Sequence, residues 1–241
     1  MNIGPSNTVS PIFFIDAPGG TGKTFVLNTI AAYLRSKVKV VLANASNGNA
    51  DILLARGCTA HARFNIPLKN ILDTYCEVTA RLDAGKTIIS SDMIIWDESS
   101  MISKTVMASV YRLLQNLISN TNFLGIKVMD FPGDFCQCLP ITVQQGHTVI
   151  TSEVMKKCPW WNSCKQLRLT ENEQLNRHGV NEANTRLADY LMELGNGTIP
   201  EVSHGCIRIP DQYVFESDNM DDFIDWAYPN ISNGNVNSAY R

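Results

Sequence analysis

Short apolar runs alternate along this chain with longer segments in which apolar residues recur every three or four positions. The short runs predict buried β-strands at residues 12–16, 39–43, 93–97, 127–131 and 165–169. The longer segments predict amphipathic helices at residues 24–35, 71–82, 105–118 and 184–194, and a last short helix at 221–226. Strands that alternate with helices are typical of a parallel sheet, so we expect an α/β fold with helices flanking that sheet.

After about Asn172 the alternation of apolar strands and helices gives way to a sequence richer in turns. Gly195-Asn196-Gly197 ends the last long helical pattern, and an asparagine- and glycine-rich stretch follows at 230–237. We therefore predict a sheet domain over residues 1–172. Residues 173–241 are predicted to form an irregular α/β appendage, the start of an incomplete second region.

Composition narrows the classes of partner. The net charge of −3 gives no overall attraction to nucleic acid, so a DNA contact must use a local patch. No run approaches the roughly 18 apolar residues of a membrane-spanning helix, and residues 1–11 lack the pattern of a signal peptide. The seven cysteines lack the matched C-x2-C pairs of a zinc site, so we expect reduced thiols in an intracellular protein without membrane contact.

The most informative segment is residues 12–24, where an apolar strand leads into a glycine-rich turn before a helix. Backbone N–H groups of such a turn bind phosphate oxygens. Lys23 would reach the β- and γ-phosphates, and the Thr24 hydroxyl would hold Mg²⁺. Ala17 stands where the strict pattern has its first glycine, a position that needs only a small side chain. The pattern predicts a nucleoside triphosphate site whose binding residues are Pro18, Gly19, Gly20, Thr21, Gly22, Lys23 and Thr24.

Polar residues that follow two later strands suit the same chemistry. Asp97 would bind Mg²⁺, and Glu98 would orient or deprotonate the attacking water. Gln137 follows the 127–131 strand and can reach a γ-phosphate, because the carboxyl ends of parallel strands surround one crevice. Taken alone, Gln137 is more often a polar turn residue. Together with the glycine-rich turn, the pattern predicts three catalytic residues: Lys23, Glu98 and Gln137.

Residues 45–50 and 57–64 contain small residues that let a backbone approach a ligand closely. Hydroxyl, imidazole and aromatic groups in these segments suit the phosphates and bases of a single strand. The candidate DNA contacts are Asn47, Thr59, His61 and Phe64. Without the other motifs, a loop with a capped helix is the favoured explanation of these residues.

The ordered motifs resemble one helicase family. Residues 13–24, Thr59-Ala60-His61, Ile94–Glu98 and Gly133-Asp134-Phe135-x-Gln137 look like the petite-integration-frequency (PIF-type) ATP-dependent DNA helicases, especially the Helitron-related forms. Leu167–Asn172 and Leu194–Thr198 extend the likeness.

This resemblance implies a RecA-like P-loop NTPase, present as its first motor domain only. It implies use of ATP and Mg²⁺ to move 5′ to 3′ on single-stranded or forked DNA and to unwind duplex. It further implies a monomer in the nucleus that serves the response to DNA damage, DNA repair, recombination and telomere maintenance.

Several positions depart from the family pattern, among them Pro132 where a glycine is usual, and two of the changes keep a second hypothesis open. The arginine expected before Gln137 is Cys136, and Thr-Glu-Asn-Met-Arg is replaced by a segment that ends in Gln174. A degenerate, transposon-derived module that binds nucleotide or DNA without useful turnover would explain both changes. A metabolic P-loop kinase is disfavoured, because it leaves the Thr59-Ala60-His61 segment unexplained.

Overall fold

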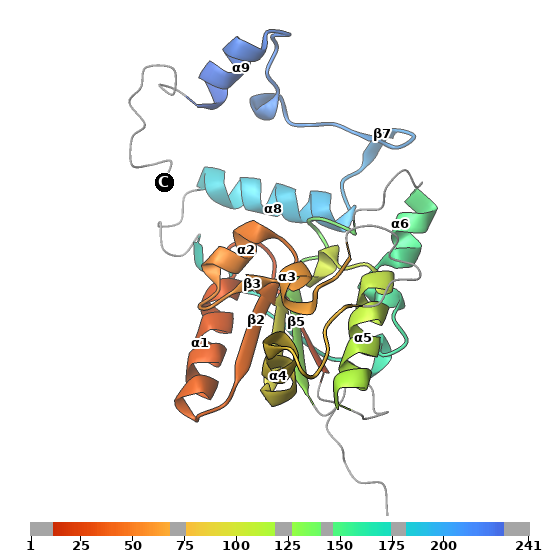
Figure 1. The fold of residues 1–241 in the computed structure, drawn as a ribbon. Coiled ribbons are helices and arrows are strands. Elements are labelled where there is room, and N and C mark those ends of the chain that lie inside the picture. The colour runs from red at the N-terminus through yellow and green to blue at the C-terminus, as the bar shows by residue number, and fades with distance from the viewer. Residues whose placement is uncertain (1–11, 68–75, 119–126, 141–146, 175–181, 229–241) are drawn as a thin grey trace, which may run out of the picture. The chain divides into compact units, whose positions relative to one another are not determined.

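The computed structural model describes residues 12–67, 76–118, 127–140, 147–174 and 182–228, and its centre is a six-stranded parallel sheet (Figure 1). The strands of this sheet are β1 (Ile12–Asp16), β2 (Val41–Ala45), β3 (Cys58–Thr59), β4 (Met93–Asp97), β5 (Val128–Gly133) and β6 (Lys165–Arg168). Their order across the sheet is β3-β2-β4-β5-β1-β6. All the pairings between them are parallel, so the carboxyl ends of the strands share one edge.

Helices connect the strands. They are α1 (Lys23–Ser36), α2 (Gly48–Leu53), α3 (Ala60–Phe64), α4 (Asp83–Ser90), α5 (Lys104–Ile118), α6 (His147–Glu153) and α8 (Glu182–Asn196). Short 3-10 turns lie at η1 (Ser99–Met101), η2 (Met155–Lys157) and η3 (Trp161–Ser163).

The sheet has a hydrophobic core on each face, because successive side chains of a strand point to opposite sides. On β4, Ile95 belongs to the core that contains Leu27 of α1. Its neighbours Ile94 and Trp96 belong to the other core, which contains Val110 of α5. Figure 1 shows α1 and α5 on opposite sides of the sheet. Both faces are therefore covered, which explains why the strands read as continuous apolar runs.

The chain divides into two compact units, residues 1–196 and 197–241. The second unit contains the antiparallel pair β7 (Glu201–Ser203) and β8 (Cys206–Ile207), a 3-10 turn η4 (Asp211–Tyr213) and the helix α9 (Met220–Ala227). The boundary after residue 172 that the sequence suggests stays a prediction.

Most predicted elements are confirmed. The strands at 12–16, 93–97 and 165–169 and the helices at 24–35, 105–118, 184–194 and 221–226 agree with the structure within two residues at either end. The strand predicted at 39–43 lies two residues later, at 41–45, and the strand predicted at 127–131 occupies 128–133.

One predicted element is wrong. Residues 76–82 of the predicted 71–82 helix are not helical, and the helix begins instead at Asp83. Residues 71–75 and the stretch 230–237 lie outside the described residues. The two-residue strand β3 was not predicted, because it is too short for an apolar pattern.

All seven cysteines are free thiols. In the described part of the chain, no helix has both the length and the apolar character needed to cross a bilayer.

Candidate active site

The loop between β1 and α1 has a backbone shape that suits phosphate binding. Gly20 and Gly22 both have a φ of +80°, a left-handed conformation that favours glycine. The Thr21 hydroxyl and N–H both donate to Pro18 O, at 2.7 and 3.2 Å, and close the turn. Gly22 directly precedes the first turn of α1, whose N–H groups have no partner within the helix and attract anions. Nothing lies within 4 Å of the place of a Cβ on Gly22, so the loop leaves room there for a bound group.

Lys23, the first residue of α1, is held between Asp97, which ends β4, and Glu98, which follows it. Its Nζ lies 2.7 Å from Asp97 Oδ1 and also donates a hydrogen bond to Glu98 Oε1. Burial alone disfavours the ammonium, but the charges and hydrogen bonds of the two carboxylates outweigh it and raise the pKa of Lys23 above its ordinary value. The structure therefore brings together three residues that the sequence placed on separate motifs.

Glu98 has an unusual backbone. Its φ of 53° and ψ of 42° are left-handed, which is uncommon for a residue with a side chain. The Glu98 N–H donates to Asp97 Oδ1 at 2.7 Å, so the turn also orients the Asp97 carboxylate. Burial raises the pKa of Asp97, and the positive charge of Lys23 offsets part of that rise. Strained backbone of this kind is concentrated at functional sites.

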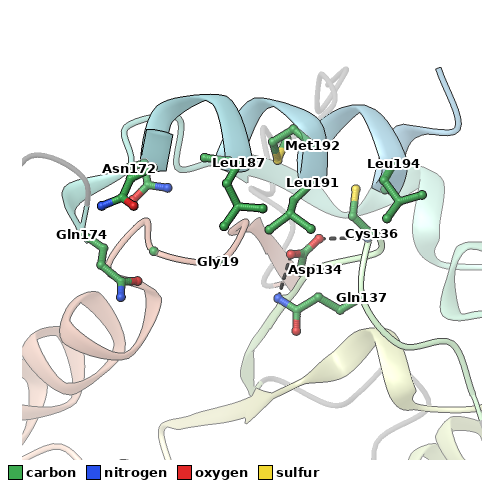
Figure 2. A pocket seen from close by; sticks show the side chains of 14 residues that line it. Gly19, Asp134, Cys136, Gln137, Asn172, Gln174, Leu187, Leu191, Met192 and Leu194 are labelled. Atoms are coloured by element: carbon green, nitrogen blue, oxygen red, sulfur yellow. Dashed lines mark hydrogen bonds between the residues drawn. The ribbon is translucent and has the colours of Figure 1, made fainter. Parts of the chain in front are cut away.

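Gln137 lies close to the glycine-rich loop. A Cβ on Gly19 would stand 4.0 Å from Gln137 Nε2. The same Nε2 donates to Asp134 Oδ2 at 2.8 Å, and the Cys136 N–H donates to Asp134 Oδ1 at 2.9 Å (Figure 2). Asp134 is buried, so it fixes the shape of this turn after β5. The turn therefore places Gln137 beside the glycine-rich loop, and its contact with a γ-phosphate stays a prediction.

The residues nominated for Mg²⁺ fit that ion. The Thr24 hydroxyl and the Asp97 carboxylate supply hard oxygen ligands, which Mg²⁺ prefers. Thr24 follows Lys23 in the first turn of α1, and Asp97 contacts the Lys23 side chain. Among the described residues no group of three or more His, Cys, Asp or Glu forms a metal cage.

A cavity of about 830 Å³ lies between the loop and α8. Its lining comprises Gly19, Gly20, Asp134, Cys136, Gln137, Asn172, Gln174, Asn184, Leu187, Ala188, Leu191, Met192, Leu194 and Gly195. In Figure 2, Leu187 and Leu191 point from α8 toward the turn that carries Asp134. This apolar wall was not predicted, because its position depends on how α8 packs.

Close contacts hold that arrangement in place. A Cβ on Gly20 would stand 2.5 Å from Asn172 Oδ1, and the Gln174 N–H donates to Gly20 O at 3.2 Å. On α8, a Cβ on Gly195 would stand 2.6 Å from Cys136 Cβ. Asn172 and Gln174 were not among the predicted site residues, although the segment that carries them follows a predicted strand on the same edge of the sheet.

Asp130 is a buried acid beneath this site. It lies on β5 opposite Ile95 of β4, and its Oδ1 has no hydrogen-bond partner. Burial, together with the nearby charge of Asp97, raises the pKa of Asp130 to about 7. Asp130 lies within the predicted strand 127–131, where an acid among apolar residues carried no prediction of its own.

Three of the DNA candidates are partly exposed. Asn47 and Thr59 cap α2 and α3, accepting hydrogen bonds from Ala50 N at 2.8 Å and Ala62 N at 3.3 Å. His61 is half-buried on α3, and burial lowers its pKa. The capped-helix interpretation therefore describes the local structure of Asn47 and Thr59, and a role in binding DNA stays a prediction for all three.

Phe64 requires a correction. Its side chain is fully buried, and its ring centroid lies 5.4 Å from that of Trp96 in the core between the sheet and α5. A ring without exposed surface cannot stack on a base. Phe64 is therefore a core residue in this structure, and its aromatic character is explained by packing.

The parallel sheet and the glycine-rich loop beside two acids define a P-loop NTPase fold. A family model described as PIF1-like helicase matches residues 5–205. The chain therefore belongs to the PIF1-like helicase family.

Individual relatives agree with this assignment. The chain is 29% identical over 131 residues to the ATP-dependent DNA helicase Pif1 of Psychrobacter sp. (strain PRwf-1), covering 53% of this chain and 20% of that protein. The Pif1 helicase of Candida albicans matches 88% of this chain and 46% of its own with a TM-score of 0.62 and 21% identity. Bacteroides Pif1 bound to ssDNA matches 66% of this chain and 38% of its own with a TM-score of 0.56 and 20% identity. The chain thus spans less than half the length of each of these relatives.

Proposed function

We propose that this chain is the first motor domain of an ATP-dependent DNA helicase that hydrolyses ATP with Mg²⁺. One observation carries the proposal: the loop lysine Lys23 contacts both Asp97 and Glu98 at the edge of the sheet where the strands end. Family membership supports it, since the curated relative from Psychrobacter is named an ATP-dependent DNA helicase.

In this proposal the residues of the loop, Pro18 to Thr24, bind the triphosphate. Lys23 neutralises phosphate charge, and Thr24 and Asp97 hold Mg²⁺, which polarises the phosphoryl group when bound. Glu98 accepts a proton from the attacking water or orients it. Because Lys23 engages Glu98 in the structure, binding of phosphate must draw Lys23 away before Glu98 can act as a base.

Gln137 would sense the γ-phosphate. Its amide is hydrogen-bonded to Asp134, on the turn that directly follows β5, so a change at the phosphate can pass to that turn. The proposal keeps the division into residues 1–172, the motor domain, and 173–241, the start of a second region.

The proposed partner is single-stranded or forked DNA. Bacteroides Pif1 has been crystallised with ssDNA and with ADP-AlF3, which supports a nucleic acid and a nucleotide as ligands of the same fold. Asn47, Thr59 and His61 are the proposed contacts. Movement in the 5′ to 3′ sense, a monomeric state, a place in the nucleus and roles in DNA repair, recombination and telomere maintenance belong to the same proposal and rest on the family resemblance.

Binding and hydrolysis of ATP by the purified chain test the proposal. With Mg²⁺ and single-stranded DNA, we expect hydrolysis that Lys23→Ala reduces by about 100-fold, because the positive charge that neutralises the phosphate is lost. Lys86→Ala is the matched control, since Lys86 is exposed on α4 and pairs with Asp83. Equal hydrolysis by the Lys23 and Lys86 variants would contradict the assignment of the site.

A second candidate is a nucleotide-binding module without useful turnover. It is favoured by Gln174, which lies at Gly20 of the loop in a position where the family resemblance implies an arginine. Calorimetry with a non-hydrolysable ATP analogue separates the two candidates. Binding of the analogue together with absent hydrolysis of ATP supports the second one.

A further inference from the structure

The segment that follows β2 contacts the turn that carries the two acids of the site. Ser46 comes directly after β2, which is a neighbour of β4 in the sheet, and it is partly exposed. The Ser46 N–H donates to Asp97 O at 3.0 Å, and the Ser46 hydroxyl donates to the same oxygen at 3.3 Å. We infer that Ser46 is a positioning residue for hydrolysis, through which DNA bound at Asn47 sets the orientation of Glu98. This inference rests on the proposed function, because it concerns the same acids and the same DNA contact.

The oxygen that Ser46 holds belongs to the peptide group between Asp97 and Glu98. The N–H of this same peptide group, that of Glu98, donates to Asp97 Oδ1 at 2.7 Å. Both polar atoms of the peptide group are therefore hydrogen-bonded, and the orientation of its plane is linked to the φ of Glu98. That φ is 53°, a left-handed value that persists only where surrounding contacts hold the backbone. The Ser46 hydroxyl supplies one of these contacts, so its removal loosens the turn that orients the Glu98 carboxylate.

The Ser46 hydroxyl is itself held in one orientation. Trp96 Nε1 donates to Ser46 Oγ at 3.2 Å, so the oxygen accepts from the indole and donates its own hydrogen to Asp97 O. Trp96 is buried, and its ring packs against Phe64 of α3, with the ring centroids 5.4 Å apart. The helix α3 also carries His61, another proposed DNA contact, so a second DNA-binding element is joined to the same hydroxyl.

Asn47, the residue after Ser46, reaches the other side of Glu98. Its Oδ1 accepts from the Ala50 N–H at 2.8 Å, and its Nδ2 lies 3.7 Å from the Sδ atom of Met101. Met101 belongs to η1, the turn that directly follows Glu98. Two consecutive residues therefore contact the chain before and after the proposed base. A DNA phosphate that takes the Asn47 amide as donor replaces the Met101 contact and shifts the peptide that leads back to Ser46.

A purely structural role of Ser46 predicts a different behaviour. Its N–H extends the parallel pairing of β2 with β4 by one bond, and that bond does not require the side chain. Ser46→Ala keeps this backbone bond and removes only the hydroxyl. If the hydroxyl served folding alone, its loss would lower stability and leave the effect of DNA on the nucleotide site unchanged.

Hydrolysis of ATP with Mg²⁺ and excess single-stranded DNA is the first measurement. We expect Ser46→Ala to lower the rate by about tenfold while ADP affinity stays within about twofold of native, because the loop that binds phosphate is unchanged. Ser46→Thr keeps a hydroxyl and should restore at least about half of the native rate. Ser90→Ala is the matched control, since Ser90 is exposed on α4 and its hydroxyl donates to Thr87 O.

The second measurement does not depend on turnover. If DNA and nucleotide both act on this turn, each changes the affinity for the other by the same factor. Fluorescence anisotropy should show that a β,γ-imido ATP analogue with Mg²⁺ changes the DNA affinity of the native chain by about fivefold or more. In Ser46→Ala this change should shrink to about twofold or less, and Ser90→Ala should keep it.

Four results would overturn the inference. Ser46→Ala could hydrolyse ATP at the native rate, or it could keep the native effect of the analogue on DNA affinity. The native chain could show no such effect, or Ser90→Ala could behave as Ser46→Ala does. Failure of the proposed function has a different signature, because then the native chain neither binds nor hydrolyses the nucleotide.

Discussion

Lys23 Nζ lies 2.7 Å from Asp97 Oδ1, so the loop before α1 and the end of β4 are joined by an ion pair before any phosphate is bound. The Asp97 side chain is 3% exposed. Removing Lys23 leaves two acids close together in a partly dry site. The contribution of this contact to the free energy of unfolding can therefore be measured separately from nucleotide binding.

We predict that Lys23→Met lowers the free energy of unfolding by about 3 kcal/mol at neutral pH, because it leaves a buried carboxylate unpaired. Urea denaturation measures the change. Lys39→Met is a suitable control, since its pair with Asp92 is largely exposed and should contribute much less to stability. Equal losses for the two variants would show that the Lys23 pair contributes no more than a surface pair.

Comparing alanine variants of Gly20 and Gly22 separates two effects on stability: the clash of a new side chain and the strain of a left-handed backbone. Both have a φ of +80°, but only at Gly20 does a Cβ meet a neighbour, Asn172 Oδ1 at 2.5 Å. We predict that Gly20→Ala destabilises the protein by about 1 kcal/mol more than Gly22→Ala does. Asn172→Ala should restore most of this difference in the Gly20→Ala background. If the double variant is as unstable as Gly20→Ala alone, the contact is not the cause.

Asp130 makes stability depend on pH. Its pKa in the folded protein is about 7, above the ordinary value of 3.8, so the unfolded chain loses the proton first. Stability should therefore fall as pH rises from about 4 to about 7, by an amount on the order of 4 kcal/mol. Asp130→Asn should remove this fall and unfold at a higher urea concentration than the native chain at pH 8.

Asp83→Asn is the control for that measurement, because the Asp83 side chain is 97% exposed. It should leave the pH dependence of the urea midpoint unchanged. A native chain whose midpoint does not decline between pH 5 and pH 8 relative to Asp130→Asn would contradict a buried, unpaired acid at this position.

Variants of His61 and Phe64 distinguish a residue proposed to contact DNA from a residue that packs in the core. We predict that Phe64→Ala lowers the free energy of unfolding by about 3 kcal/mol or more, because its ring is fully buried against Trp96. His61→Ala should leave stability within about 0.5 kcal/mol and weaken binding of single-stranded DNA, as measured by fluorescence anisotropy. Unchanged DNA affinity in His61→Ala would remove this residue from the proposed interface.

The sheet could be predicted where a strand is a continuous apolar run, as in Met93–Asp97, because both faces of that strand are covered. The helix Asp83–Ser90 could not. Position 85 of this helix must be glycine, because a Cβ there would stand 2.0 Å from Thr79 O in the preceding turn. That contact is invisible in the local pattern, which favoured a helix further upstream.

Part of the candidate site could be predicted from the sequence, and part could not. Lys23, Asp97 and Glu98 could be grouped in advance, because parallel strands end at one edge. The apolar wall on α8 could not, since it depends on Gly195 packing against Cys136. Phe64 was misinterpreted because an aromatic residue beside polar ones suits both a base-stacking surface and a core, and only burial distinguishes them.

Hydrolysis of ATP by Glu98→Gln in the presence of Mg²⁺ and excess single-stranded DNA tests the central claim most directly. Glutamine preserves size and cannot accept a proton, and Lys23 keeps its contact with Asp97. The account predicts hydrolysis by the native chain, a loss of about 100-fold or more in the variant, and ADP affinity within about threefold of native. Hydrolysis by Glu98→Gln at the native rate would contradict it.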